Sequence, residues 1–138
     1  MRSHTAKRAQ AARSCRRLQT LSGAYSCICL VHDVGVVAFR DPNGIRPLVL
    51  GTRATARGPE WCVASEDCAF GPIGFELVRD VQPGEMVIIT KQGDLICSQC
   101  TRQQLAPCVF EYIYLARPDS VLNGISVYAS ARWLRCFM

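Results

Sequence analysis

Short apolar runs alternate with turn residues along most of this chain, and this pattern predicts a domain rich in β-strands. Residues 24–31, 36–39 and 48–50 are apolar runs with many β-branched or aromatic side chains, as is typical of strands. Residues 40–44, R-D-P-N-G, separate the last two runs and combine a proline with residues that tolerate positive φ. We therefore expect a hairpin-like corner here, and a first strand that contributes Ile28, Leu30 and Val31 to the core.

The second half of the chain predicts an antiparallel meander that ends in a helix. Apolar or alternating runs are separated by glycine- and proline-containing turns at 61–64, 75–81, 85–90 and 95–97. Ser65 is a candidate N-cap for a short helix over residues 67–70. The sequence V-F-E-Y-I-Y-L at 109–115 has strong β propensity and predicts a further strand. Ser126 is placed to cap a final helix through residues 127–134.

Composition indicates a globular protein with a core. The chain has 138 residues, of which 49% are hydrophobic and 20% charged. No apolar run approaches the roughly 18–20 residues that a membrane helix needs. The basic N-terminus is not followed by an apolar stretch with a cleavage site, so we expect no signal peptide, no membrane association and a cytoplasmic location.

The net charge of +5 comes from the N-terminal arm and not from the domain. Residues 1–17 contain six arginines and lysines and no acid, whereas the remaining 121 residues carry 10 basic and 11 acidic side chains. Such an arm can bind nucleic acid by releasing counterions. No aromatic residue precedes Tyr25, so the arm offers no stacking surface for bases. A solvated tail is the favoured interpretation, and nucleic-acid binding the alternative.

The nine cysteines form no recognisable disulfide framework, and without a secretory signal we expect reduced thiols that are mostly buried. Cys97 and Cys100 form a C-x-x-C pair, which is half of a structural zinc site. Cys108 is the nearest third candidate ligand, but His4 and His32 lie far upstream. Thiols at the end of a strand are therefore the favoured interpretation, and a metal site the alternative.

Several segments together resemble the family of glutamine phosphoribosylpyrophosphate amidotransferases. The corner sequence A-F-R-D-P-N-G-I-R-P-L-V-L-G is less specific, because a similar corner occurs in the glutaminase domain of asparagine synthetases. The sequence F-E-Y-I-Y-L-A-R-P-D-S is what selects this family. The matching segments, in the order and spacing of the family, are residues 23–26, 38–51, 63–66, 74–84 and 110–120.

The resemblance implies an enzyme of purine synthesis that has two domains. It also implies that the enzyme assembles as a homo-oligomer. An N-terminal-nucleophile glutaminase domain, with four α-β-β-α layers, releases ammonia from glutamine. A phosphoribosyltransferase domain then uses the ammonia to displace pyrophosphate from phosphoribosyl pyrophosphate, with magnesium on the phosphates. For this chain we expect an α+β fold in which residues 21–105 form the second half of the glutaminase domain, with mainly antiparallel strands. Residues 106–138 then form a linker strand and the start of the transferase domain, and residues 1–20 an unrelated basic tail.

The resemblance assigns no catalytic or cofactor-binding residue to this chain. The family begins with Cys-Gly-Ile, whereas this sequence begins Met1-Arg2-Ser3. The family's glutamine-binding residues lie upstream of the matching segments, and its phosphoribosyl pyrophosphate loop lies downstream. We therefore expect this chain to be an inactive fragment of the enzyme that needs no cofactor.

The matching residues are expected to have structural roles. Arg40, Asp41 and Arg46 are predicted to tie the corner together as an Arg–Asp pair, and Ser65-Glu66 to provide a cap and a packed polar contact. Cys108 corresponds to an iron–sulfur ligand in one branch of the family. The other three ligands have no counterpart in this chain, so a plain thiol is the favoured interpretation.

Residues 1–20 and 129–138 depart from the family pattern, which leads to the hypothesis of a truncated or frameshifted product. A different class of function is also open: a non-catalytic interaction or structural protein that exposes an apolar patch on an uncovered sheet face.

The nucleic-acid alternative has a direct test. If the arm binds nucleic acid, the affinity falls steeply with salt, because neutralised phosphates release counterions, and binding disappears when residues 1–17 are deleted. Fluorescence anisotropy with a labelled oligonucleotide at several salt concentrations measures both effects. Binding that survives the deletion would contradict this hypothesis.

Overall fold

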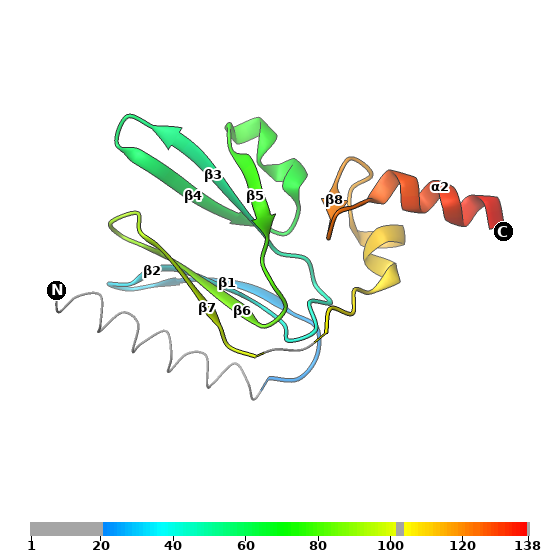
Figure 1. Cartoon of the computed structure of the whole chain (residues 1–138), viewed down its shortest axis with the longest axis horizontal. Coiled ribbons are helices and arrows are strands. Elements are labelled where there is room, and N and C mark those ends of the chain that lie inside the picture. The colour runs from blue at the N-terminus through cyan, green and yellow to red at the C-terminus, as the bar shows by residue number, and fades with distance from the viewer. Residues whose placement is uncertain (1–20, 102–103, 138) are drawn as a thin grey trace.

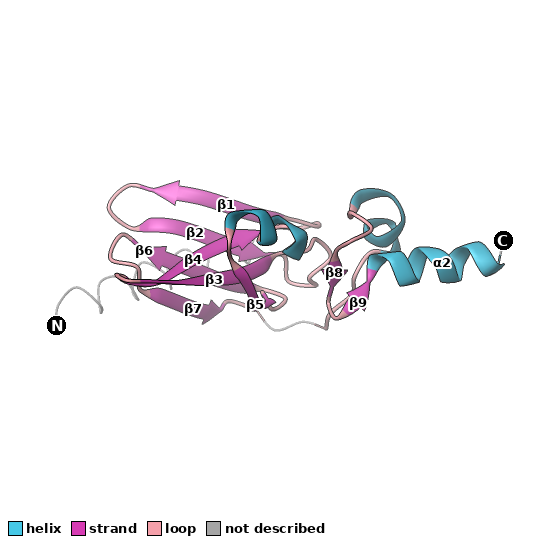
Figure 2. Cartoon of the chain, turned by 90° about the horizontal axis from the view of Figure 1, so that it is seen from above, coloured by secondary structure: helices cyan, strands magenta, loops and turns pink. Residues whose placement is uncertain are grey.

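Two antiparallel β-sheets lie face to face, and a partly helical segment follows them at the C-terminal end (Figures 1 and 2). The computed structural model describes residues 21–101 and 104–137. The four-stranded sheet consists, in order, of β1 (Ser26–Val31), β2 (Gly35–Arg40), β6 (Glu85–Thr90) and β7 (Leu95–Gln99). The three-stranded sheet consists of β4 (Gly58–Ala64), β3 (Val49–Thr55) and β5 (Glu76–Asp80).

The predicted strands and their antiparallel pairing are confirmed, but they do not form one continuous meander. In the four-stranded sheet β2 pairs with β6, so Ala38 lies opposite Val87. The intervening strands β3, β4 and β5 form the second sheet, in which Leu50 lies opposite Val63. The corner at residues 41–48 therefore carries the chain from one sheet to the other.

The core between the sheets is made by small and branched side chains that alternate along the strands. Its buried members come from both sheets and from the segments that join them, and Trp61, Val63 and Leu95 pack against them. The members are Ala38, Leu48, Leu50, Val81 and Val87.

The predicted core role of the first strand is wrong for two of its three residues. Ile28 is 51% exposed and Leu30 is 86% exposed, whereas Val31 is partly buried. Ile28 pairs with Ala38 and so points to the same side of the sheet as that core residue. However, β1 is an edge strand, and Figure 2 shows it lying beyond the margin of the three-stranded sheet. No layer formed by the described residues therefore covers these two side chains.

The opposite face of the four-stranded sheet carries a second apolar cluster. Val34, Met86 and Ile88 are buried there, and Phe39 and Ile96 are among the partly buried side chains that pack on them. Both faces of this sheet are therefore apolar near its centre, which explains why β6 reads as a continuous hydrophobic run rather than an alternating one.

The outer face of the three-stranded sheet is covered by two short helices, η1 (Asp67–Ala69) and η2 (Gly71–Ile73). Phe70, between them, lies so close to Gly51 that a Cβ atom at position 51 would be 2.9 Å from the phenyl ring. The helix predicted near residues 67–70 is thus confirmed. Its cap is not: Glu66 occupies the N-cap position of η1 and makes no side-chain cap hydrogen bond, so the assignment of Ser65 is wrong.

The predicted linker strand over residues 109–115 is also wrong, because the chain there forms the π-helical turn η3 (Glu111–Leu115). Glu111 and Tyr112 are consecutive and both buried, whereas a strand would point them to opposite faces. Tyr112 packs against Leu122 and Val127, and its hydroxyl donates to the Leu122 carbonyl at 3.2 Å. These tertiary contacts outweigh the β propensity of the sequence.

The chain ends in a small hairpin and the predicted helix. Strands β8 (Val121–Leu122) and β9 (Ile125–Ser126) pair and lead directly into α2 (Val127–Phe137). The Ser126 hydroxyl accepts a hydrogen bond from the Ala129 N–H at 3.3 Å, which confirms the predicted cap. Within the described ranges, no helix is both long and apolar enough to span a membrane. The basic arm lies outside these ranges.

Candidate functional site

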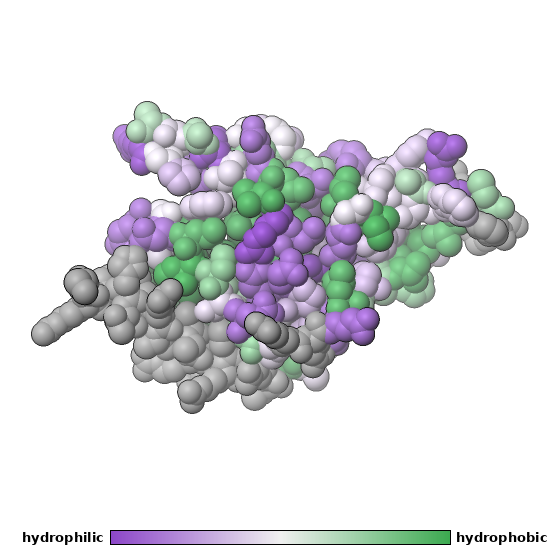
Figure 3. Space-filling view, viewed as in Figure 1, coloured by the Kyte–Doolittle hydropathy of each residue, from purple (hydrophilic) through white to green (hydrophobic). Residues whose placement is uncertain are grey.

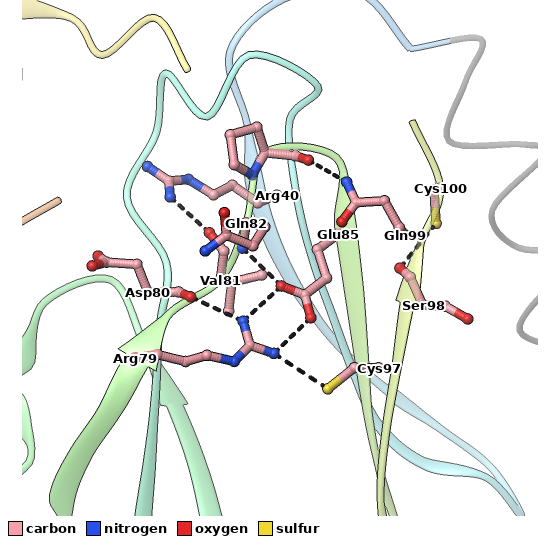
Figure 4. Close-up of polar contacts among 11 residues, drawn as sticks. Arg40, Arg79, Asp80, Val81, Gln82, Glu85, Cys97, Ser98, Gln99 and Cys100 are labelled. Carbon is pink, nitrogen blue, oxygen red and sulfur yellow. Dashed lines mark hydrogen bonds and ion pairs between the residues drawn. The ribbon is translucent and has the colours of Figure 1, made fainter. Parts of the chain in front are cut away.

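A dense polar cluster lies at the corner between the two sheets, where Arg40 ends β2 (Figure 4). Its side chain is only 3% exposed. The guanidinium donates to the carbonyl oxygens of Val81 and Arg46 at 2.7 Å each and of Gly44 at 2.8 Å, and to the side-chain oxygen of Asn123 at 3.2 Å. All four acceptors are amide oxygens, and they come from three separate parts of the chain.

Burial lowers the pKa of the Arg40 guanidinium, because it disfavours the charged form. The nearby carboxylates of Asp80 and Asp41 act to raise this pKa. An arginine stays protonated even with a lowered pKa, so the corner holds a buried positive charge that is stabilised mainly by carbonyl dipoles.

Asp41 organises the turn itself. It is fully buried, and its two carboxylate oxygens accept hydrogen bonds from the N–H groups of Asn43, Ile45 and Arg46, each at 3.0 Å. Its backbone carbonyl accepts two more, from Gly44 at 3.0 Å and from Gly84 at 2.8 Å. Arg40 and Asp41 thus tie the corner together, but the predicted Arg–Asp ion pair is wrong: Arg40 and Asp41 both act through backbone groups, and Arg46 pairs with Glu111.

A second charged group lies beside the corner and links β5, β6 and β7 (Figure 4). The guanidinium of Arg79 makes two parallel hydrogen bonds with the carboxylate of Glu85, at 2.7 and 2.8 Å, and a third with the thiol of Cys97 at 3.4 Å. The Gln82 N–H also donates to Glu85, at 2.7 Å.

The pKa shifts of this group follow from burial and pairing. Burial acts to raise the pKa of Glu85, but the hydrogen bonds from Arg79 and the Gln82 N–H outweigh it, and the pKa of Glu85 is lowered. The pKa of Arg79 is raised, chiefly by its hydrogen bond with Glu85. Burial and the neighbouring carboxylate raise the pKa of the Cys97 thiol, so this cysteine is not an activated nucleophile.

The C-terminal segment is anchored to the sheets by a third set of contacts. The Glu66 carboxylate accepts hydrogen bonds from the Ser120 hydroxyl at 2.6 Å and from the Arg117 N–H at 2.8 Å. This confirms the predicted packed polar contact of Glu66. Arg46, from the corner, forms an ion pair with the buried Glu111 of η3.

The cysteines do not come together as metal ligands. Cys97 contacts Arg79 on one face of the four-stranded sheet, whereas Cys100 packs with the apolar cluster on the other face, so the C-x-x-C pair does not converge. No group of three or more potential ligands (His, Cys, Asp or Glu) occurs in the part of the chain that the structure describes. Cys108 is half-buried, and its carbonyl accepts from the Glu111 N–H at 3.1 Å.

The expectation of mostly buried, reduced cysteines is wrong in two respects. The free thiols in the described ranges are all half-buried or exposed, because most lie at sheet edges or in the C-terminal segment. Cys100, in contrast, is disulfide-bonded.

Sequence reasoning missed the Arg79–Glu85 pair and the contact of Asn123 with Arg40. The sequence does contain a sign of the Arg79–Glu85 pair, because Glu85 is the single acidic residue at the start of an otherwise apolar strand. Such a residue needs a partner when the strand is buried. The contact between Arg40 and Asn123 joins residues that are 83 positions apart, and no local sequence pattern reveals it.

Comparison with known proteins identifies the family. The chain is 53% identical over 113 residues to the amidophosphoribosyltransferase of Pasteurella multocida, a match that covers 81% of this chain and 22% of the relative. The amidophosphoribosyltransferase of Pseudomonas aeruginosa is 50% identical over 107 residues, covering 77% and 21%. A scan against models of protein families finds no match.

Comparison with solved structures points to the same family. The fold matches that of a glutamine phosphoribosylpyrophosphate amidotransferase from Bacillus subtilis, solved with ADP and GMP, with a TM-score of 0.72 and 36% sequence identity. This match covers 83% of the chain and 24% of that protein. The matched proteins are amidophosphoribosyltransferases, and this chain corresponds to a segment of proteins of that family. It spans about a fifth of the length of the relatives it matches.

The Arg79–Glu85 pair makes a testable prediction about pH. Because the pKa of Glu85 is lowered from 4.5 in the folded chain, the pair stabilises the fold fully above that pH, and the stabilisation is lost as the pH falls below it. Thermal unfolding between pH 7 and pH 3 should show this loss. Glu85→Gln should lower the melting temperature at pH 7 and flatten the acid-side slope.

Glu60 provides a matched control, because its ion pair with Arg53 is exposed. Exposed pairs contribute only about 0–1 kcal/mol, so Glu60→Gln should keep the wild-type slope. Equal slopes for Glu85→Gln and the wild type would contradict the assignment.

Proposed function

We propose that residues 21–105 are part of the glutaminase domain of an amidophosphoribosyltransferase, and that the following segment connects it to the phosphoribosyltransferase domain. The two antiparallel sheets packed face to face agree with the central β-β layers of an N-terminal-nucleophile fold. In this proposal the chain supplies the structural frame of the domain, and it is inactive by itself.

The observation that carries the proposal is how the polar residues of the family motifs are used. Arg40, Asp41 and Glu66 direct their side chains to backbone groups or to other structural residues of the chain. A catalytic acid, base or nucleophile must instead present a free atom to a substrate. These motifs therefore account for the fold rather than for chemistry.

The substrates proposed for the whole enzyme are glutamine and phosphoribosyl pyrophosphate, in a cytoplasmic homo-oligomer that uses magnesium. The described residues do not fit a metal or an iron–sulfur cluster, since Cys108 has no further ligands grouped with it.

A second candidate is a non-catalytic interaction protein. The exposed apolar side chains at the edge strand β1 and in the C-terminal segment favour it. This function is compatible with similarity to the enzyme family, because the contacts that hold the fold together do not depend on catalytic activity.

The proposal predicts that this chain catalyses neither the release of ammonia from glutamine nor the displacement of pyrophosphate from phosphoribosyl pyrophosphate. Purified full-length chain, shown to be folded by circular dichroism and a cooperative thermal transition, should release no ammonia from glutamine above a blank without protein. It should also release no pyrophosphate from phosphoribosyl pyrophosphate supplied with ammonium and magnesium. An assay coupled to glutamate dehydrogenase measures the ammonia, and an assay coupled to pyrophosphatase measures the pyrophosphate.

Glutamine-dependent ammonia release that co-purifies with the chain would contradict inactivity. If it appeared, serine substitutions made one at a time at the free cysteines would show whether a thiol of this chain carries it. A contaminating glutaminase would be unaffected by all of these substitutions.

A further inference from the structure

The C-terminal segment, residues 109–137, has an apolar cluster of its own. Tyr112, Leu122 and Val127 are buried against one another there. The two apolar clusters of the sheets contain no residue of this segment. Figure 1 shows β8 and α2 beside the sheets, and on the face drawn in Figure 3 hydrophilic surface lies between the green areas of the two parts. Each apolar cluster of the described residues therefore lies on one side of the junction.

Hydrogen bonds and ion pairs cross this junction, and most of their acceptors are carboxylates of the sheet side. Besides the two bonds to Glu66 described above, Asp67 accepts from the Val121 N–H at 3.0 Å and Asp80 from the Asn123 N–H at 3.4 Å. We term these contacts the polar seam. It comprises Glu66–Arg117, Glu66–Ser120, Asp67–Val121, Asp80–Asn123, Arg40–Asn123 and Arg46–Glu111.

Asn123 joins three parts of the molecule within this seam. Its side-chain oxygen accepts from Arg40 at 3.2 Å, and its side-chain nitrogen donates to the Tyr112 hydroxyl at 3.2 Å. Its own N–H donates to Asp80. The residue thus connects the corner and the end of β5 to the apolar cluster of the C-terminal segment.

The hairpin turn offers a different reason for an asparagine at this position. Asn123 and Gly124 join β8 to β9, with φ values of 50° and 75°. A two-residue turn with positive φ at both positions favours the sequence Asn-Gly. Glycine also suits the first position, because it adopts positive φ without strain. Asn123→Gly therefore keeps the turn and removes only the side-chain amide, which separates the two roles.

We propose that the C-terminal segment opens and closes on the sheets as one body, with the polar seam as its latch and Asn123 as the residue that positions it. Hydrogen bonds of a seam are exchanged for hydrogen bonds to water when it opens, so the net cost of each is modest. An apolar cluster shared between two bodies would resist opening, because separation exposes apolar surface to water. Units that open separately often coincide with structural motifs, as this segment does.

The seam has a use in the proposed enzyme. With residues 21–105 in the glutaminase domain, the seam joins that domain to the start of the next, and its closure sets the angle between the two. This use rests on the proposed function, whereas the opening of the segment does not. Amide exchange measures the opening alone and the ammonia assay the function alone, so either can fail without the other.

Hydrogen–deuterium exchange of the full chain, followed by mass spectrometry of peptic peptides, tests the proposal. In the wild type the amides of residues 109–127 should exchange faster than those of β2 and β6, because they open without unfolding of the sheets. Asn123→Gly should speed exchange in residues 109–127 about tenfold or more, the factor that the loss of a hydrogen bond to a charged group implies. Circular dichroism shows that each variant is folded.

Ile88→Val distinguishes opening of the segment from unfolding of the whole chain. Ile88 is buried in an apolar cluster of the sheets, so the lost methyl group destabilises the closed and the open states equally. Exchange in β2 and β6 should rise about 2–10-fold, while residues 109–127 keep the wild-type rate. Glu60→Gln, in the exposed ion pair with Arg53, should change neither region.

An Ile88→Val variant in which both regions exchange faster by the same factor would overturn the proposal, because the chain would then open only as a whole. Equal protection of both regions in the wild type would overturn it as well. So would an Asn123→Gly variant that exchanges residues 109–127 at the wild-type rate, since Asn123 would then serve only the turn.

Discussion

The buried guanidinium of Arg40 is the contact on which the rest of this structure depends. It joins the end of β2 to the corner turn, to the segment between β5 and β6, and to the C-terminal hairpin through Asn123. Asp41, the next residue, holds the same turn from the other side by accepting three backbone N–H groups. Two adjacent charged residues thus fix how the two sheets and the C-terminal segment are placed relative to one another.

This arrangement has an energetic consequence. Hydrogen bonds to charged groups contribute about 1.5–3 kcal/mol each, and buried acceptors left without a donor cost about as much. The core between the sheets is small, and one edge strand lies outside it. The polar corner therefore carries a share of stability that a larger apolar core would otherwise supply. The bidentate Arg79–Glu85 pair adds a second polar connection, between β5 and β6.

The sequence predicted the local elements well and the long-range contacts poorly. The strands of both sheets, the short helix after β4 and the Ser126 cap all follow from local pattern, because adjacent residues decide them. The predicted strand at 109–115 was wrong because the burial of Glu111 and Tyr112 depends on Arg46 and Leu122, which are distant in sequence. Ile28 and Leu30 were predicted to be buried for a similar reason: hydrophobicity indicates a strand, but not whether another layer reaches it. The corner sequence showed that Arg40 and Asp41 hold the turn, but their backbone acceptors and donors, like the buried state of Glu85, needed the structure.

The similarity to amidophosphoribosyltransferases agrees with the contacts of the shared motif residues, which hold the fold together. The direct test of this account is the free energy of unfolding of Arg40→Lys, measured by urea denaturation against the wild type. Lysine keeps the charge but cannot donate in three directions at once from a planar fork. If the corner holds the structure together, the substitution should cost about 3 kcal/mol or more. A loss below about 0.5 kcal/mol, the size typical of surface substitutions, would contradict the central role of Arg40.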